Sequence, residues 1–70
     1  MITVNSAMQQ ENIKMLLEGI EEEGVTFSFK EKKGIQLIFK ITGEKEQAVR
    51  KAKDAIKGTD WGKVLYFNVV

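Results

Sequence analysis

Two alternating stretches near the middle of the chain constrain its fold more than any other feature. Residues 25–30 and 35–41 both alternate apolar and polar side chains, and a charged segment ending in Gly34 separates them. A period of two is typical of strands that bury one face, and a glycine between two such strands is typical of a hairpin turn. We expect a β-hairpin whose loop is Lys32-Lys33-Gly34, with Gly34 in the left-handed conformation.

This loop sets a register for the hairpin. Shifting the register by one residue would mix the two faces, so the pattern specifies it well. In the expected register the large apolar side chains of both strands, apart from Ile38, lie on one face. The opposed pairs are Glu31 and Ile35, Phe29 and Leu37, Phe27 and Phe39, and Val25 and Ile41.

A helical pattern precedes the hairpin. Ser6 followed by Gln9 has the spacing of a capping box, which predicts the start of a helix. We expect this helix to contain Gly19 and the acidic run Glu21–Glu23, and to end at Gly24. Its apolar stripe has the spacing i, i+3, i+4, i+7 and consists of Ile13, Leu16, Leu17 and Ile20.

A second helix is expected between Thr42-Gly43 and Gly58, with Gly58 as its C-cap. Its small apolar residues predict close packing on the sheet or on the first helix. They are Ala48, Val49, Ala52, Ala55 and Ile56. The residues expected in the core of the whole domain are Phe27, Phe39, Leu16, Ile20 and Ile56.

Short strands are expected at both ends, over Met1–Asn5 and Lys63–Val70. The element order is then β-α-β-β-α-β in one domain, residues 1–70. The simplest arrangement with two right-handed crossovers is an α+β, ferredoxin-like two-layer sandwich with an antiparallel sheet of order 4-1-3-2. This fold hosts many unrelated functions, so it implies none of them.

The composition excludes several kinds of chemistry. The chain has no Cys and no His, so disulfides, thiolate metal sites and the commonest general base are missing. We therefore expect no catalytic residues, no cofactor and no metal site, and hence no enzyme. The net charge is +1 and no apolar stretch approaches the ~20 residues of a membrane span, so we expect no membrane partner. A natural protein of this kind would be cytoplasmic.

The lysines at the hairpin tip raise the question of nucleic-acid binding. Lys33-Gly34 begins like the third-strand signature of RNA-recognition-motif domains. However, Ile35 and Leu37 stand where that signature has the aromatic side chains that stack on bases. The tip lysines Lys30, Lys32 and Lys33 surround Glu31 and have no arginine beside them, so we interpret the tip as a solvated turn.

Other features of the sequence could mark functional sites. The glutamates of the acidic run would point in different directions on a helix and could not converge on one ion. Trp61 precedes the last strand and is expected to cover one end of the core. Tyr66 and Ile38 are candidates for the sheet face opposite the helices, which we expect to be mostly polar.

One segment shows a local family resemblance. The stretch Leu16–Phe27, LLEGIEEEGVTF, resembles part of the small subunits of diol and glycerol dehydratase reactivating factors. In that family a helix ends in a similar Gly-Ile-Glu-Glu-Glu-Gly pattern and leads into a strand. The resemblance implies a non-catalytic exchange partner of the dehydratase. It covers about a dozen residues, and Thr26 stands where the family tends to have proline.

Three functional hypotheses follow. The first is a computationally designed ferredoxin-like mini-domain, a stable scaffold without activity or partner, because Pro, Cys and His are all absent. The second is a small natural interaction or regulatory domain that associates, for example as a homodimer, through its open sheet face or an edge strand. The third is an acylphosphatase-like enzyme, but the single arginine, Arg50, lies within a helix and not in an anion-binding loop.

Overall fold

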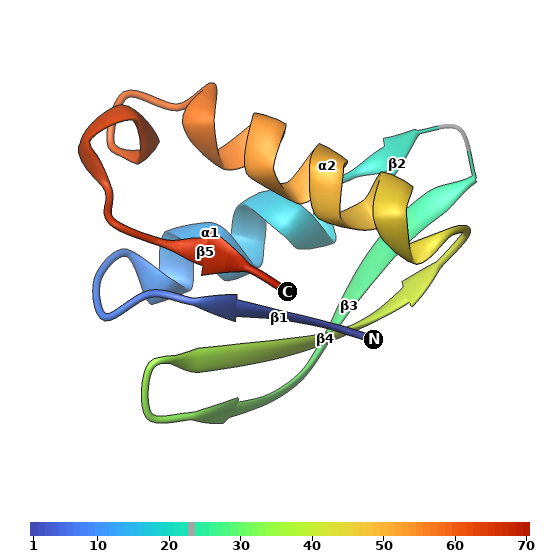
Figure 1. Ribbon diagram of the computed structural model, residues 1–70, viewed down its shortest axis with the longest axis horizontal. Coiled ribbons are helices and arrows are strands. Elements are labelled where there is room, and N and C mark those ends of the chain that lie inside the picture. Colours follow the sequence, from blue (N-terminus) through green and yellow to red (C-terminus); the bar gives the residue numbers. More distant parts are fainter. Residues whose placement is uncertain (23) are drawn as a thin grey trace.

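The computed structural model describes residues 1–22 and 24–70. Over these residues the protein is an α+β domain in which a five-stranded antiparallel sheet curls around two helices (Figure 1). The order of strands in the sheet is β2-β3-β4-β1-β5. Along the chain the elements are β1 (Ile2–Asn5), α1 (Gln10–Glu18), β2 (Glu21–Glu22), β3 (Val25–Lys33), β4 (Gln36–Thr42), α2 (Lys45–Lys57), the 3-10 helix η1 (Gly62–Val64) and β5 (Asn68–Val69).

The prediction of a ferredoxin-like sandwich with sheet order 4-1-3-2 is wrong. A strand that the sequence pattern did not predict, β2, extends the sheet beyond β3, and the sheet curls into a half-barrel. The first strand does lie between β4 and β5, and each of these pairs is antiparallel. The error therefore lies in the edge beyond β3 and in the curvature of the sheet.

The added strand exists because α1 is shorter than its apolar stripe suggested. The helix ends at Glu18, and Gly19 is its C-cap and not an interior residue. Glu21 and Glu22 then pair with Thr26 and Val25 of β3. Gly24, with φ 78°, belongs to the turn between the two strands and does not end a helix. Glu23 lies outside the described residues.

The predicted capping box at the start of α1 is also wrong. The helix begins at Gln10, and its N-cap is Gln9, with φ 61° and no side-chain capping bond. Ser6 is buried, and its Oγ donates a hydrogen bond to the carbonyl oxygen of Met8 at 2.7 Å. The Ser6 hydroxyl therefore stabilises the loop between β1 and α1, and leaves the helix terminus to Gln9.

The β3–β4 hairpin forms, but with a two-residue loop, Gly34-Ile35, in place of the predicted three-residue loop. Gly34 has φ 60° at the first loop position, which suits a type II′ turn. Phe29 consequently lies opposite Phe39, and Phe27 lies opposite Ile41, two residues away from the predicted register. A shift by two keeps each side chain on its face, so the apolar face was correctly predicted up to the bulge between Phe29 and Glu31.

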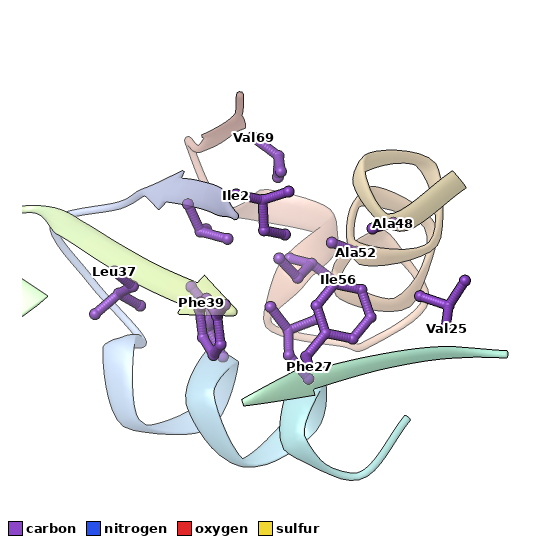
Figure 2. Packing of buried hydrophobic residues seen from close by; sticks show 12 residues of the cluster. Ile2, Val25, Phe27, Leu37, Phe39, Ala48, Ala52, Ile56 and Val69 are labelled. Carbon is purple, nitrogen blue, oxygen red and sulfur yellow. The ribbon is translucent and has the colours of Figure 1, made fainter. Parts of the chain in front are cut away.

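The core lies between the concave face of the sheet and the helices. Figure 2 shows Phe27, Phe39 and Ile56 converging there, as expected. The rings of Phe29 and Phe39 meet edge to face with centroids 5.6 Å apart, a favoured aromatic geometry. The other two residues predicted for the core, Leu16 and Ile20, are half-buried and pack against it.

The last residues of the chain form other elements than the sequence predicted. Gly58 caps α2 as expected, and its N–H donates to the carbonyl oxygen of Asp54 at 2.9 Å. The expected long strand Lys63–Val70 is instead the 3-10 helix η1 followed by the short strand β5. The Oγ1 of Thr59 organises this turn, because it donates to the Ile56 carbonyl at 2.7 Å and accepts the Gly62 N–H at 2.8 Å.

Candidate functional site

The lysines of the hairpin tip do not come together as a binding site. Lys32 and Lys33 are exposed at the end of β3, beside the turn. The Nζ of Lys33 lies 3.9 Å from a carboxylate oxygen of Glu31, and that of Lys30 lies 3.7 Å from the sulfur of Met1. The tip is a turn, as interpreted from the sequence, although the loop consists of Gly34 and Ile35.

The carboxylates of the acidic run do not come together at one point either. Glu21 and Glu22 are exposed on β2, and Glu23 is outside the described residues. Glu22 reaches Lys51 of α2, with 3.6 Å between Oε2 and Nζ. Across residues 1–22 and 24–70, no three carboxylate side chains are grouped so that they could hold a metal ion.

The aromatic side chains near the end of the chain have different environments. Trp61 is half-buried and packs against the core, which confirms the expectation that it covers one end of it. Tyr66 is 98% exposed and precedes β5. Ile38 lies in β4, between the inward-facing Leu37 and Phe39, and is half-buried on the outer face of the sheet.

The backbone geometry singles out the β5 edge of the sheet. Thr3 and Val70 exchange two backbone hydrogen bonds, each 2.9 Å, so the peptide groups of Val70 point towards β1. Along an antiparallel ladder this direction alternates from residue to residue. The N–H and C=O of Val69 therefore point away from β1. Phe67 lies just before β5, and the same alternation, continued by two residues, would point its peptide groups outward as well. Since β5 ends the sheet, no strand within residues 1–22 and 24–70 faces these groups.

The side chains of this edge carry no charge. The segment Leu65–Val70, LYFNVV, has β-branched and aromatic residues and no Lys, Arg, Asp, Glu, Pro or Gly. Tyr66 and Val70 are 98% and 60% exposed, and they share the outer face with Asn68. Such a segment has the composition that favours pairing with another strand.

The surroundings of the edge are hollowed on both sides. A groove of about 660 Å³ is lined by the start of the β1–α1 loop, by Ile35 of the hairpin turn and by the segment Tyr66–Asn68. On the helix side, a smaller hollow of about 180 Å³ is lined by Lys53, Lys57, Phe67 and Asn68. The edge is thus open to a partner and is flanked by two cationic side chains of α2.

From the sequence, association through an edge strand was expected only in general terms, and the β5 edge was not singled out although a signal was present. The expected long strand Lys63–Val70 hid the short edge strand that the structure shows there. The run of seven uncharged residues after Lys63 is the feature that marks an unprotected edge, because charged side chains are the usual means of blocking such pairing.

Comparisons with known proteins do not assign this domain to a family. No protein-family model matches the chain, and neither a curated protein nor a solved structure matches it significantly. The local resemblance of Leu16–Phe27 therefore remains a prediction. Within the described part of the chain, neither helix has the length and apolar character needed to cross a membrane.

Proposed function

We propose that this chain is a non-catalytic interaction domain that binds an extended protein strand at its β5 edge. One observation carries the proposal: the outward-pointing peptide groups of Val69 lie in a segment without charged side chains. A strand added there would satisfy these groups, as in β-augmentation. The hydrogen bonds would supply affinity, and Tyr66 and Val70 would contact alternate side chains of the partner.

Binding without catalysis agrees with the composition. With neither His nor Cys, the chain lacks the side chains that most often serve as general base and as thiol nucleophile. The proposal needs no cofactor, because the binding chemistry is that of backbone amides and apolar side chains.

The test is an NMR titration of the labelled chain with a soluble peptide that alternates Thr and Val between terminal lysines. We expect saturable shifts of the amide signals of residues 66–70 and unchanged signals in β2, whose glutamates oppose strand addition. Tyr66→Lys should weaken binding at least about tenfold. Val64→Lys is the matched control, because Val64 is 88% exposed but lies in η1, before the edge segment.

Unchanged amide signals of residues 66–70 at about 1 mM peptide would contradict the proposal. That result would favour the other hypothesis from the sequence, a designed scaffold without partner. The joint absence of Pro, Cys and His is the observation that supports this second candidate.

A further inference from the structure

We propose that the strand received by the β5 edge is β5 of a second copy of this chain, in an antiparallel pair whose twofold axis passes through Asn68. The inference rests on the proposed function and adds the identity of the partner and the register. It predicts a symmetric dimer in which the two sheets become one continuous sheet.

The backbone supports a pair centred on Asn68. In this register Phe67 of each copy lies opposite Val69 of the other. The peptide groups of Val69 point outward, and those of Phe67 do so once the segment extends β5 by one residue. The two pairs can exchange four hydrogen bonds. Asn68 lies opposite its own copy at a position without backbone hydrogen bonds, where side chains come closest.

The side chains on the outer face complement one another in the same register. Tyr66 of each copy lies opposite Val70 of the other, and these two side chains are 98% and 60% exposed in the single chain. Aromatic and β-branched residues form favourable cross-strand pairs. Pairs centred on Phe67 or Val69 would keep backbone hydrogen bonds but would place Tyr66 or Val70 opposite the amide of Asn68.

The amide of Asn68 suits the centre of the interface. Its Oδ1 accepts a hydrogen bond from the Nδ2 of Asn5 at 2.7 Å. Its own Nδ2 donates no hydrogen bond to the described residues. Two such amides facing each other across the axis can interact through these donors.

Charge explains why a second copy fits this edge and not the opposite one. Two identical segments Leu65–Val70 meet without any charged side chain between them. Two β2 strands would bring Glu21 and Glu22 of both copies together, and like charges in opposed strands destabilise the pair.

The flanking lysines give the dimer a recognisable salt dependence. Lys53 and Lys57 line the hollow beside Phe67 and Asn68, so a dimer gathers four ammonium groups on the helix side of the interface. Their repulsion is screened by salt, because the Debye length falls from roughly 30 Å at 0.01 M to 10 Å at 0.1 M. Dimerisation should therefore strengthen as salt is added over this range.

The experiment is sedimentation equilibrium of the full chain between about 10 μM and 1 mM, since so small an interface suits a Kd in this range. We expect a monomer–dimer equilibrium. Tyr66→Lys should raise the dimer Kd at least about tenfold and leave the fold unchanged, because this side chain is exposed. Val64→Lys should leave the Kd within about twofold.

Asn68→Asp tests the register itself. Aspartate can still accept the hydrogen bond from Asn5, but it places two carboxylates face to face only if the axis passes through residue 68. We expect the dimer Kd to rise at least about tenfold. In a mixture of labelled and unlabelled chains, contacts between the Tyr66 ring and the Val70 methyl groups of the other copy should appear.

The two proposals can fail separately. A chain that stays monomeric at about 1 mM but binds the alternating peptide at residues 66–70 would overturn the second copy as partner and leave the proposed function intact. A dimer unaffected by both Tyr66→Lys and Asn68→Asp would likewise overturn this inference. A monomer that also fails to bind the peptide would overturn both.

Discussion

The two edges of the sheet make an instructive pair. Each ends in a strand of two residues, β2 at one edge and β5 at the other. At the β2 edge both residues are exposed glutamates, and Glu22 is tied to Lys51 of α2. At the β5 edge the six residues Leu65–Val70 carry no charged side chain, and Tyr66 lies almost entirely in solvent.

The difference shows that a short strand is not enough to protect an edge. Unpaired peptide groups accept another strand wherever side chains permit it, and charged side chains are a common means of preventing this. The β2 edge has that protection, and the β5 edge lacks it. A substitution in the strand that both edges share should weaken both of them, whereas a substitution near one edge should weaken that edge alone.

The largest effect is expected from Phe39→Ala. Phe39 is fully buried in β4, and its ring packs on Phe29, so its removal leaves a cavity in the core. We expect the free energy of unfolding to fall by about 3–5 kcal/mol in urea titrations. Because β4 lies between β3 and β1, amide protection should fall at both edges together.

Ile38→Ala is the control for Phe39→Ala, since it shortens the neighbouring side chain on the outer face of the same strand. Ile38 is only half-buried, so Ile38→Ala should lower the free energy of unfolding clearly less than Phe39→Ala does. A loss below roughly 1 kcal/mol for Phe39→Ala would mean that Phe39 does not lie on the buried face.

A second large effect should be confined to the side of the molecule that carries β5. A Cβ at Gly62 would overlap the carbonyl oxygen of Ile56, a backbone atom that cannot move aside cheaply. Gly62→Ala should therefore displace η1 and cost about 2–3 kcal/mol in unfolding free energy. Amide exchange should quicken in β5 well before it does in β2.

Gly19→Ala is the matched control for Gly62→Ala. Gly19 has a right-handed backbone conformation, and a Cβ there would meet its nearest neighbours at 3.5 Å, an ordinary contact. The free energy of unfolding of Gly19→Ala should stay within about 1 kcal/mol of that of the unchanged chain. Equal losses for the two glycines would contradict the close packing of Gly62 under α2.

The burial pattern of the hairpin could be predicted from the sequence, whereas its register could not. Alternation predicts which side chains share a face, and Phe27 and Phe39 are buried accordingly. The register depends on the turn, and a glycine with positive φ fits either the last position of a three-residue loop or the first of a two-residue loop. Gly34 occupies the first position of a two-residue loop.

The edges were harder to predict because both depend on contacts between distant segments. The apolar stripe continued the first helix through Gly19, yet Ile20 packs on the core from beyond the helix end, and Glu21 and Glu22 pair with β3. At the other edge, the alternating pattern of Lys63–Val70 gave no sign of η1. That helix follows from the hydrogen bonds of Thr59, which tertiary packing brings into place.

A smaller effect is expected at the turn that holds the β2 edge. The Oγ1 of Thr42 accepts the backbone N–H of Thr26 at 3.1 Å and donates to the Gly24 carbonyl at 3.0 Å. Thr42→Val removes both bonds and the one to the Thr26 hydroxyl, and we expect the free energy of unfolding to fall by about 1 kcal/mol, since the site is exposed. Amide exchange of residues 24–26 should quicken while that of β5 stays unchanged.

Thr26→Val provides the comparison for Thr42→Val. Its hydroxyl lies 2.8 Å from that of Thr42 and makes only this hydrogen bond among the described residues. Thr26→Val should therefore lower the free energy of unfolding less than Thr42→Val does. The opposite ranking would show that the Thr42 hydroxyl does not hold the turn.

The smallest effect concerns the ion pair that ties the β2 edge to α2. The Nζ of Lys51 lies 3.6 Å from Oε2 of Glu22, but the Glu22 side chain is 73% exposed, so water and salt screen the attraction. Glu22→Gln should lower the unfolding free energy by roughly 0.5 kcal/mol or less at low salt, and the difference should vanish near 1 M salt. Glu21→Gln is the control, because Glu21 is exposed like Glu22 and forms no ion pair within the described residues. If both variants lose the same stability, the ion pair contributes nothing, and the glutamates of β2 protect the edge only by their charge.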